Sequence, residues 1–590
     1  MSKITCPYCF GTFGDDHVVF RANAGWTLDE LDEMRTSGLD EYGRSISDDE
    51  IRLRELFRRY DSQDSSGNDK KLDDLLLRFW DGRGGESAFA SADPQWNMPH
   101  IVPGSPEYEQ MVVRTPATDE YGFVRDKDGF IMRMFDRFNP SLDKPMERLC
   151  PYCHNPLPLP DYGKYPTLFI SVVGITSSGK TVYLKQLLGN LSSAIKNTGY
   201  RIGAVNLDQD NGVVASGQPL PGSTDNQTMR RPMAVSLLQE SNPSHGLTLV
   251  FYDIAGENCV ASVNSDGTID NHALIGHFIA RSDALLFLID PKQVPLFAPV
   301  GKNSVAEVQD VIKVVTKIRA SLNPKHPSWD GIPVAVVLTK SDSLAGKLED
   351  SSPVFHDINR KVPGNPNHMV QGFVLNEFKQ INSALQEKFE KNASALMADV
   401  AAFGLRGFFA VSALVGGVSV SVEKYKNLYM LDADNENKFM QLRDWADGWN
   451  QRSPEERRHY PNCPIRTSQG EKIEFAPEQS ITEGLGNKIE TEIFGVTNEL
   501  GTVAQEYFTL SDVAMTLNPL SFPIGIPKAR RVEEPILWIL WQKRCIMPRF
   551  QGKAMPTKHF FESAKYYNER CAATARENAI EERRFYNCEI

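Results

Sequence analysis

The segment that most constrains this chain runs from Thr167 to Leu187, TLFISVVGITSSGKTVYLKQL. Its first half is an apolar, β-branched run that predicts a buried strand, and its second half places apolar residues at helical spacing. Between them, Gly174 to Thr181 spells G-x-x-x-x-G-K-T, in the strand–loop–helix context that this phosphate-binding pattern requires. The glycines let successive backbone N–H groups point inward, and the start of the helix adds partial positive charge. A plain Gly/Ser turn between a strand and a helix is the alternative.

This pattern predicts a site for a nucleotide and Mg²⁺. Lys180 is expected to reach the β- and γ-phosphates, and the Thr181 hydroxyl is expected to ligate Mg²⁺. The rest of the loop is expected to surround the phosphates with four further residues, Gly174, Ser177, Ser178 and Gly179.

Composition narrows the class of protein. The 590 residues are 41% hydrophobic and 24% charged, which is ample for a large core, and the net charge of −12 disfavours general nucleic-acid or anionic-membrane binding. The N-terminus lacks the apolar core of a signal peptide, and no apolar run approaches the roughly 18–20 residues of a membrane span. Nine cysteines, an odd number, argue against a disulfide framework, so we expect a cytoplasmic protein.

Two nearly identical tetrapeptides, Cys6-Pro7-Tyr8-Cys9 and Cys150-Pro151-Tyr152-Cys153, lie about 140 residues apart. Each can form a turn that directs two thiolates at one metal ion, and two such turns complete a tetrahedral Cys₄ site. A single pair could instead be redox-active, but neither copy lies beside the βαβ pattern of such proteins. The repeat therefore predicts structural Zn²⁺ bound by Cys6, Cys9, Cys150 and Cys153. His154 is a substitute ligand or, as we favour, a bystander.

Two further motifs follow the phosphate-binding pattern. The polar stretch from Asp208 to Arg231 is placed where a mobile loop carries a threonine to Mg²⁺; Thr224 is our choice and Thr228 the alternative. Asp253-Ile254-Ala255-Gly256-Glu257 ends the next predicted strand. Asp253 is expected to brace Mg²⁺ through water, the Gly256 N–H to meet the γ-phosphate, and Glu257 to position the attacking water.

The last two motifs concern the base. Thr339-Lys340-Ser341-Asp342 follows a predicted strand, and Asp342 there can accept from N1–H and the exocyclic amine of guanine, an arrangement that adenine lacks. The stem of Lys340 can lie over the base, with Thr339 bracing the loop. Ser412 and Ala413 follow one more strand, where a backbone N–H can meet the guanine O6.

With these four motifs in order, the chain resembles a translation-factor-related, Ras-like (TRAFAC-class) P-loop GTPase, and within that class the bacterial double-GTPase families that carry zinc ribbons. The resemblance implies an α/β fold with a mainly parallel sheet flanked by helices, an N-terminal Cys₄ zinc ribbon and large, mostly α-helical insertions. The expected parts are a zinc ribbon with an inserted helical and hairpin module (1–160), the GTPase core (164–416), an insertion (417–529), a closing helix of the GTPase domain (530–546) and a helical tail (547–590).

The resemblance implies GTP as substrate, GDP and phosphate as products, and an unidentified protein effector or activator in a bacterial, defence-type multi-component system. Departures from the class pattern predict slow or partner-dependent hydrolysis. Thr339 replaces asparagine, Glu257 replaces glutamine, and Thr176 and Ser177 replace glycine and asparagine of other members. An ATPase with a coincidental Thr-Lys-Ser-Asp sequence and a nucleotide-gated scaffold with negligible hydrolysis are the competing hypotheses.

Overall fold

The computed structural model describes most of the first 414 residues and selected later segments. The described residues are 3–59, 73–80, 98–103, 105, 110, 112, 114, 116–135, 137–138, 145–175, 178–196, 198–206, 232–256, 259, 274–297, 302–324, 326–344, 373–414, 418–424, 427–430, 448–449, 451–461, 477, 495–497, 503–505, 520–523 and 529–546. The chain divides into two compact units. One comprises Met1–Val213, Ser223–Ala413 and Ala529–Ile590, and the other comprises Val214–Gly222 and Leu414–Lys528.

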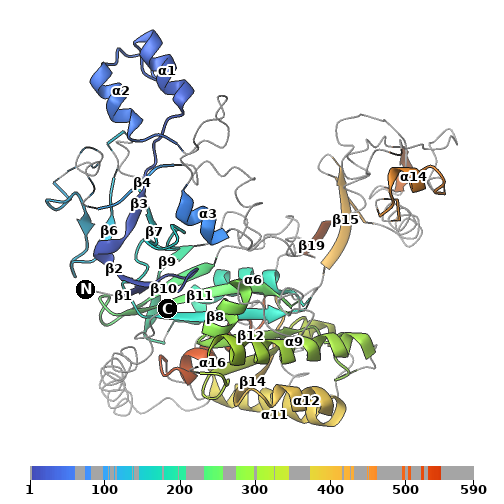
Figure 1. Cartoon of the computed structure of the whole chain (residues 1–590). Coiled ribbons are helices and arrows are strands. Elements are labelled where there is room, and N and C mark those ends of the chain that lie inside the picture. Colours follow the sequence, from blue (N-terminus) through green and yellow to red (C-terminus); the bar gives the residue numbers. More distant parts are fainter. Residues whose placement is uncertain are drawn as a thin grey trace. The chain divides into compact units, whose positions relative to one another are not determined.

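A seven-stranded sheet forms the centre of the first unit (Figure 1). Its strands, from one edge to the other, are β14 (Leu405–Ala410), β13 (Pro333–Leu338), β12 (Ala284–Ile289), β8 (Thr167–Gly174), β11 (Gly246–Ala255), β10 (Met233–Gln239) and β9 (Tyr200–Asn206). The five strands from β14 to β11 run parallel, while β10 pairs antiparallel with both of its neighbours. The mostly parallel α/β sheet expected from the sequence is confirmed.

Helices and the N-terminal module cover the two faces of this sheet. The helices are α6 (Lys180–Ala194), α8 (Leu274–Arg281), α9 (Lys302–Leu322), α11 (Leu375–Asn392), α12 (Ser394–Val400) and α16 (Glu534–Gln542), with the 3₁₀ helix η4 (Ser341–Leu344). Along β8, Ile170 and Val172 pack with α6 and α16, while Phe169 and Val173 pack with α8, α9 and α12. Because neighbouring residues of a strand point to opposite faces, a strand that is buried on both faces, such as β8, is apolar along most of its length.

The N-terminal module is built from short elements. Its strands are β1 (Lys3–Thr5), β2 (Thr12–Gly14), β3 (Val19–Arg21), β4 (His100–Ile101), β5 (Val124–Arg125), β6 (Ile131–Arg133) and β7 (Glu147–Leu149), and its helices are η1 (Asp15–His17), α1 (Leu28–Ser37), α2 (Asp48–Glu55) and α3 (Asp74–Trp80). The described residues of this module include three α-helices and the β5–β6 hairpin, where the sequence analysis expects an inserted helical and hairpin module. Thr27 and Glu30 form a capping box that fixes the start of α1.

The mostly helical character expected of 417–529 stays a prediction, because most of that stretch lies outside the described part of the second unit. The described part contains the sheet β16–β15–β19 (Asn427–Met430, Val418–Lys424, Leu520–Pro523), the pair β17–β18 (Gly495–Thr497, Val503–Gln505) and one short helix, α14 (Pro454–Arg457). Strand therefore exceeds helix in these residues. The tail predicted over 547–590 lies outside the described residues.

None of the helices in the described part of the chain combines the length and apolar character that crossing a bilayer would require.

Candidate functional site

The strand β8 ends at Gly174 and the helix α6 begins at Lys180, so the G-x-x-x-x-G-K-T pattern connects a strand to a helix, as predicted. Gly179 precedes the helix in the left-handed region, with φ of +81°, which favours glycine. A Cβ atom on Gly174 would lie 2.6 Å from the Leu288 carbonyl oxygen, and one on Gly256 would lie 3.0 Å from the Gly174 carbonyl oxygen. Close backbone approach thus requires glycine at both positions, and it places Gly256 directly against the loop.

The phosphate-binding and metal-binding residues of the prediction meet at this turn. The Lys180 ammonium donates to the carbonyl oxygens of Gly174 and Ile175 at 2.6 and 3.3 Å, so it lies within the loop. The Thr181 hydroxyl donates to Oδ2 of Asp253, near the end of β11, at 3.1 Å. Lys180 and Thr181 are 7% and 9% exposed, so this pair of polar groups is held at the buried start of α6.

The oxygens of Thr181 and Asp253 fit Mg²⁺. Both are hard oxygen donors, and a hydrogen bond of 3.1 Å holds the Thr181 hydroxyl beside Asp253, where Thr181 can ligate the ion and Asp253 can brace it through water. Mg²⁺ keeps several waters in such sites, which suits one carboxylate and one hydroxyl.

Thr339 links the predicted base-reading segment to the predicted phosphate loop. It follows β13, and its backbone N–H donates to the Ile289 carbonyl oxygen at 2.9 Å. Its hydroxyl lies 2.8 Å from the Ser178 carbonyl oxygen and 3.2 Å from that of Ile289. Two motifs that are 161 residues apart are therefore joined by one buried hydrogen bond.

Lys340 lies beside the same loop. Its Cε atom is 3.6 Å from where a Cβ on Gly179 would stand, and its backbone is left-handed with φ of +48°. Its ammonium pairs with Asp290 Oδ2 at 2.8 Å. Asp290 follows β12 and is 4% exposed. Sequence reasoning did not single out Asp290, although a carboxylate directly after a buried strand was the available signal.

Ser412 pairs through its backbone with Arg530, which lies shortly before α16. Its N–H donates to the Arg530 carbonyl oxygen at 3.0 Å, and the Arg530 N–H donates back at 2.6 Å. The Ser341 N–H donates to the Val411 carbonyl oxygen at 3.0 Å, so the two predicted base-contacting segments lie side by side. Ala413 follows Ser412 and packs against the core on the α6 side.

Several predicted site residues cannot be placed. Ser177, Thr224, Thr228 and Glu257 lie outside the described residues, as does the side chain of Asp342, whose backbone belongs to η4. Their roles stay predictions.

The two C-P-Y-C segments form matching turns. Cys6 N–H bonds to the Gly11 carbonyl oxygen and Cys150 N–H to that of Asn155, at 2.9 and 3.0 Å. Each turn ends on a left-handed residue, Phe10 with φ of +58° and His154 with φ of +52°. The repeated tetrapeptide thus produces two equivalent knuckles.

The four sulfur atoms fit a tetrahedral zinc ion. The Sγ atoms of Cys6 and Cys153, and those of Cys9 and Cys150, are 3.7 Å apart. Zinc–sulfur bonds of about 2.3 Å place sulfurs about 3.8 Å apart. Backbone N–H groups donate to Sγ of Cys6, Cys9 and Cys150 at 3.4 Å each. Burial raises the pKa of the Cys6 thiol, so a bound cation would be needed to hold this sulfur as a thiolate.

His154 is not part of this cluster. Its Nδ1 lies 2.7 and 2.9 Å from the two carboxylate oxygens of Asp73, which precedes α3. Of our two interpretations, the bystander of the Cys₄ site fits this geometry.

The first knuckle packs directly on the central sheet. The Tyr252 hydroxyl donates to the Pro7 carbonyl oxygen at 2.7 Å. The Phe10 ring makes an edge contact with Phe169 of β8 and with Phe278 of α8, with centroids 5.4 and 5.9 Å apart. Tyr252 immediately precedes Asp253, so the Cys₄ cluster contacts the strand that carries the predicted Mg²⁺ ligand.

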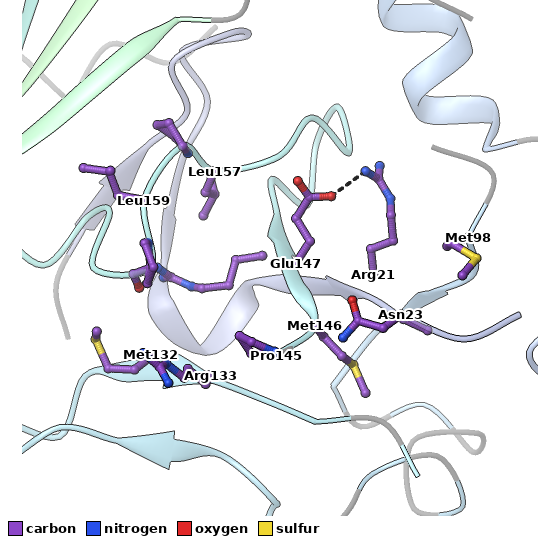
Figure 2. Close-up of a pocket in the computed structure, with 14 residues that line it drawn as sticks. Arg21, Asn23, Met98, Met132, Arg133, Pro145, Met146, Glu147, Leu157 and Leu159 are labelled. Carbon is purple, nitrogen blue, oxygen red and sulfur yellow. Dashed lines mark hydrogen bonds and ion pairs between the residues drawn. The ribbon is translucent and has the colours of Figure 1, made fainter. Parts of the chain in front are cut away.

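A pocket of about 550 Å³ lies in the N-terminal module. Figure 2 shows Arg21 and Glu147 joined by an ion pair of 2.7 Å between methionine and proline side chains. Arg148 also lines it, and burial lowers the pKa of Arg148 to about 10. No residue of the phosphate loop lines this pocket, and we assign no chemistry to it.

Comparisons with known proteins add little to this geometry. Neither a family model nor a curated protein sequence matches the chain. Among solved structures, a variant of SsGBP is 12% identical with a TM-score of 0.16, over 42% of this chain and 50% of that one. A variant of Era from Aquifex aeolicus bound to GDP and AlF₄⁻ is 12% identical with a TM-score of 0.19, over 48% and 68%. The chain thus spans half the length of the first and about two thirds of the second. Scores this low carry no argument, so the functional conclusion rests on the site.

Proposed function

We propose that this chain binds GTP with Mg²⁺ and hydrolyses it to GDP and phosphate, as a molecular switch that acts on a protein partner. The observation that carries the proposal is the hydrogen bond from the Thr339 hydroxyl to the Ser178 carbonyl oxygen. It ties the segment that would select the base to the loop that would hold the phosphates. A phosphate-binding turn alone would fit many nucleotides, and the preference for guanine rests on the role predicted for Asp342 in the segment that this bond places beside the turn.

The phosphate half of the site has a role for each residue. The Lys180 ammonium supplies the positive charge for the β- and γ-phosphates, with the N–H groups at the start of α6. Thr181 and Asp253 hold Mg²⁺, which neutralises charge that develops on the phosphate oxygens. Gly256 contributes its N–H, because its backbone touches the phosphate loop.

The base half depends on the turn after β13. Asp342 accepts two hydrogen bonds from guanine, the Lys340 stem covers the base, and a backbone N–H of Ser412 or Ala413 meets O6. The ion pair with Asp290 keeps Lys340 beside Gly179. We propose that 164–416 and 530–546 form this GTPase domain.

Hydrolysis depends on residues beyond the described site. Thr224 would complete the Mg²⁺ shell and Glu257 would position water, with Thr228 as the alternative to Thr224. A nucleotide-gated scaffold remains the second candidate, because the knuckle packs on β11 and couples another module to the nucleotide site. It predicts tight GTP binding with negligible phosphate release in the absence of a partner. The resemblance to bacterial double-GTPases favours a multi-component, defence-type system as the setting.

Nucleotide selectivity tests the proposal. Fluorescent GTP, ATP and XTP are titrated against purified wild-type protein and the Asp342→Asn variant. We expect GTP preference in the wild type and, in the variant, a loss of GTP affinity of about 10- to 100-fold with a gain in XTP affinity. Hydrogen bonds to a charged group contribute about 1.5–3 kcal/mol, and 1.4 kcal/mol is tenfold.

The matched control is Asp330→Asn, an exposed aspartate after which the chain enters β13. It should leave all three affinities unchanged. If ATP and GTP bind equally well and Asp342→Asn changes neither affinity, the GTPase proposal is wrong. Only the prediction of a phosphate-binding loop would then stand.

A further inference from the structure

Three side chains from distant parts of the N-terminal module converge beside the second knuckle. Asp73 precedes α3, His100 begins β4 and His154 follows Cys153. One ligand atom from each lies within 4.8 Å of the others. We propose that Asp73, His100 and His154 form a second metal site, distinct from the Cys₄ cluster, for a divalent transition-metal ion of the zinc class.

The distances between the donor atoms suit one ion. His154 Nδ1 lies 2.7 Å from Asp73 Oδ1, and His100 Nδ1 lies 3.9 Å from Asp73 Oδ2. Tetrahedral bonds of about 2.0–2.1 Å place ligand atoms about 3.3 Å apart, between these two values. The ion takes the place of the hydrogen bond between His154 Nδ1 and Asp73, and the three side chains adjust to close around it.

The donor set and its burial point to a metal rather than to a surface cluster. The Asp73 and His154 side chains are 4% and 6% exposed, while that of His100 is 27% exposed. Two imidazoles and a carboxylate are typical ligands of zinc, nickel and iron, and they leave a coordination position open. His100 lies at the solvent side, which provides the entry path.

Neighbouring groups hold the site in place and balance its charge. Arg21 donates to the His154 carbonyl oxygen at 3.2 Å, but its charge is paired with Glu147. Asp73 Oδ1 also accepts from the Leu76 N–H at 3.1 Å, and so caps α3. The left-handed backbone of His154 turns its ring toward Asp73, whereas the equivalent Phe10 of the first knuckle packs on the sheet.

Metal counting on the full-length protein tests the proposal. After incubation with zinc and exhaustive dialysis, elemental analysis of the wild type should give two zinc ions per chain. Asp73→Asn and His100→Gln should each retain only one. Asparagine can still cap α3, so Asp73→Asn separates loss of the metal from loss of the helix cap. His100 is partly exposed, so its replacement leaves the core intact.

Cobalt substitution locates each ion. The sulfur-to-cobalt charge-transfer band should saturate with the first equivalent, and a second should bind without adding to it in the wild type alone. His17→Gln, at an exposed histidine, is the control and should retain both ions. A wild type that holds one zinc ion, or a second ion that persists in both Asp73→Asn and His100→Gln, would overturn the proposal. Near-ultraviolet circular dichroism checks that each variant is folded.

Discussion

The hydroxyl of Thr339 replaces the asparagine amide that this position holds in similar GTPases. A hydroxyl has one proton to donate, and two carbonyl oxygens face it, those of Ser178 at 2.8 Å and Ile289 at 3.2 Å. The shorter contact braces the phosphate loop. We predicted that replacing asparagine by Thr339 weakens the bracing of this loop. One bracing hydrogen bond is nevertheless present, donated by the Thr339 hydroxyl.

Thr339→Val should loosen this loop. It removes the hydroxyl with little change of shape and leaves a buried carbonyl oxygen short of a donor. We expect a loss of about 1 kcal/mol in unfolding free energy, and GDP affinity about five-fold weaker. Urea titration and fluorescence anisotropy measure the two effects.

Thr339→Asn serves as the matched control, because its amide can donate to the same oxygen. It should equal or exceed the wild type in GDP affinity. If Thr339→Val bound GDP as tightly as the wild type, the hydrogen bond to Ser178 would have no part in holding the nucleotide.

The sequence predicted some residues of the candidate site and missed others. Lys180 and Thr181 belong to one short, contiguous sequence pattern. The sequence alone therefore predicts both residues and their roles together. Asp253 was predicted to act at the same Mg²⁺ site, because a strand-end carboxylate suits that pattern, but its hydrogen bond with Thr181 was not predicted. Asp290 was missed, since its partner Lys340 lies 50 residues away and an aspartate after a strand is common.

Strands were predicted correctly where their run of apolar residues was continuous. The buried strands β8, β11, β12 and β13 were all predicted from such runs. The edge strand β9 was not, because it alternates half-buried and exposed residues and contains Gly203. The helix α11 was also missed, although its buried residues Phe378, Ile381, Leu385 and Phe389 recur every three or four positions.

The helix α16 is fixed by a buried ionic contact that no local pattern shows. Arg531, 1% exposed, donates through Nε and Nη2 to both oxygens of Glu534, and through Nη1 to Glu377 of α11 at 2.9 Å. Glu534 is fully buried. Since Arg530 carries the bridge to Ser412, this contact also positions a predicted base-contacting segment.

Arg531→Met should therefore be severely destabilising. It leaves the Glu534 carboxylate buried without its guanidinium, which costs about 3–5 kcal/mol in pairs of this kind. Urea unfolding followed by tryptophan fluorescence measures the change. Adding Glu534→Gln to Arg531→Met should restore part of the loss, because the buried charge is then removed.

An exposed arginine gives the comparison. Arg52, whose side chain is 76% exposed, pairs with Asp49 on α2. Arg52→Met should leave the unfolding midpoint unchanged. Equal midpoints for Arg531→Met and Arg52→Met would show that the buried contact does not hold α16.

In the first unit, two sequence features that are far apart along the chain contact the same strand, β11. The predicted zinc ribbon and the predicted nucleotide site share β11, since Tyr252 bonds to the first knuckle and Asp253 to Thr181. Tyr252 and Asp253 are neighbours on one strand, so we expect a shift of the knuckle to displace the Asp253 carboxylate. The sequence predicted each site but not this contact, because pairing Pro7 with Tyr252 spans 245 residues.

Removal of zinc should consequently weaken nucleotide binding. A chelator that prefers zinc to magnesium is added to the full chain, with Mg²⁺ kept in excess, and GDP affinity and unfolding are measured. Structural zinc contributes on the order of 10 kcal/mol to folding, so we expect the N-terminal module to unfold first and GDP affinity to fall.

Tyr252→Phe, which keeps the ring stacked on Phe278 and loses only the hydrogen bond to Pro7, should show a smaller fall in GDP affinity. His100→Gln protein, with its four cysteines intact, should bind GDP as the wild type does. Unchanged GDP affinity after the module has unfolded would mean that the two sites share a strand without acting on each other.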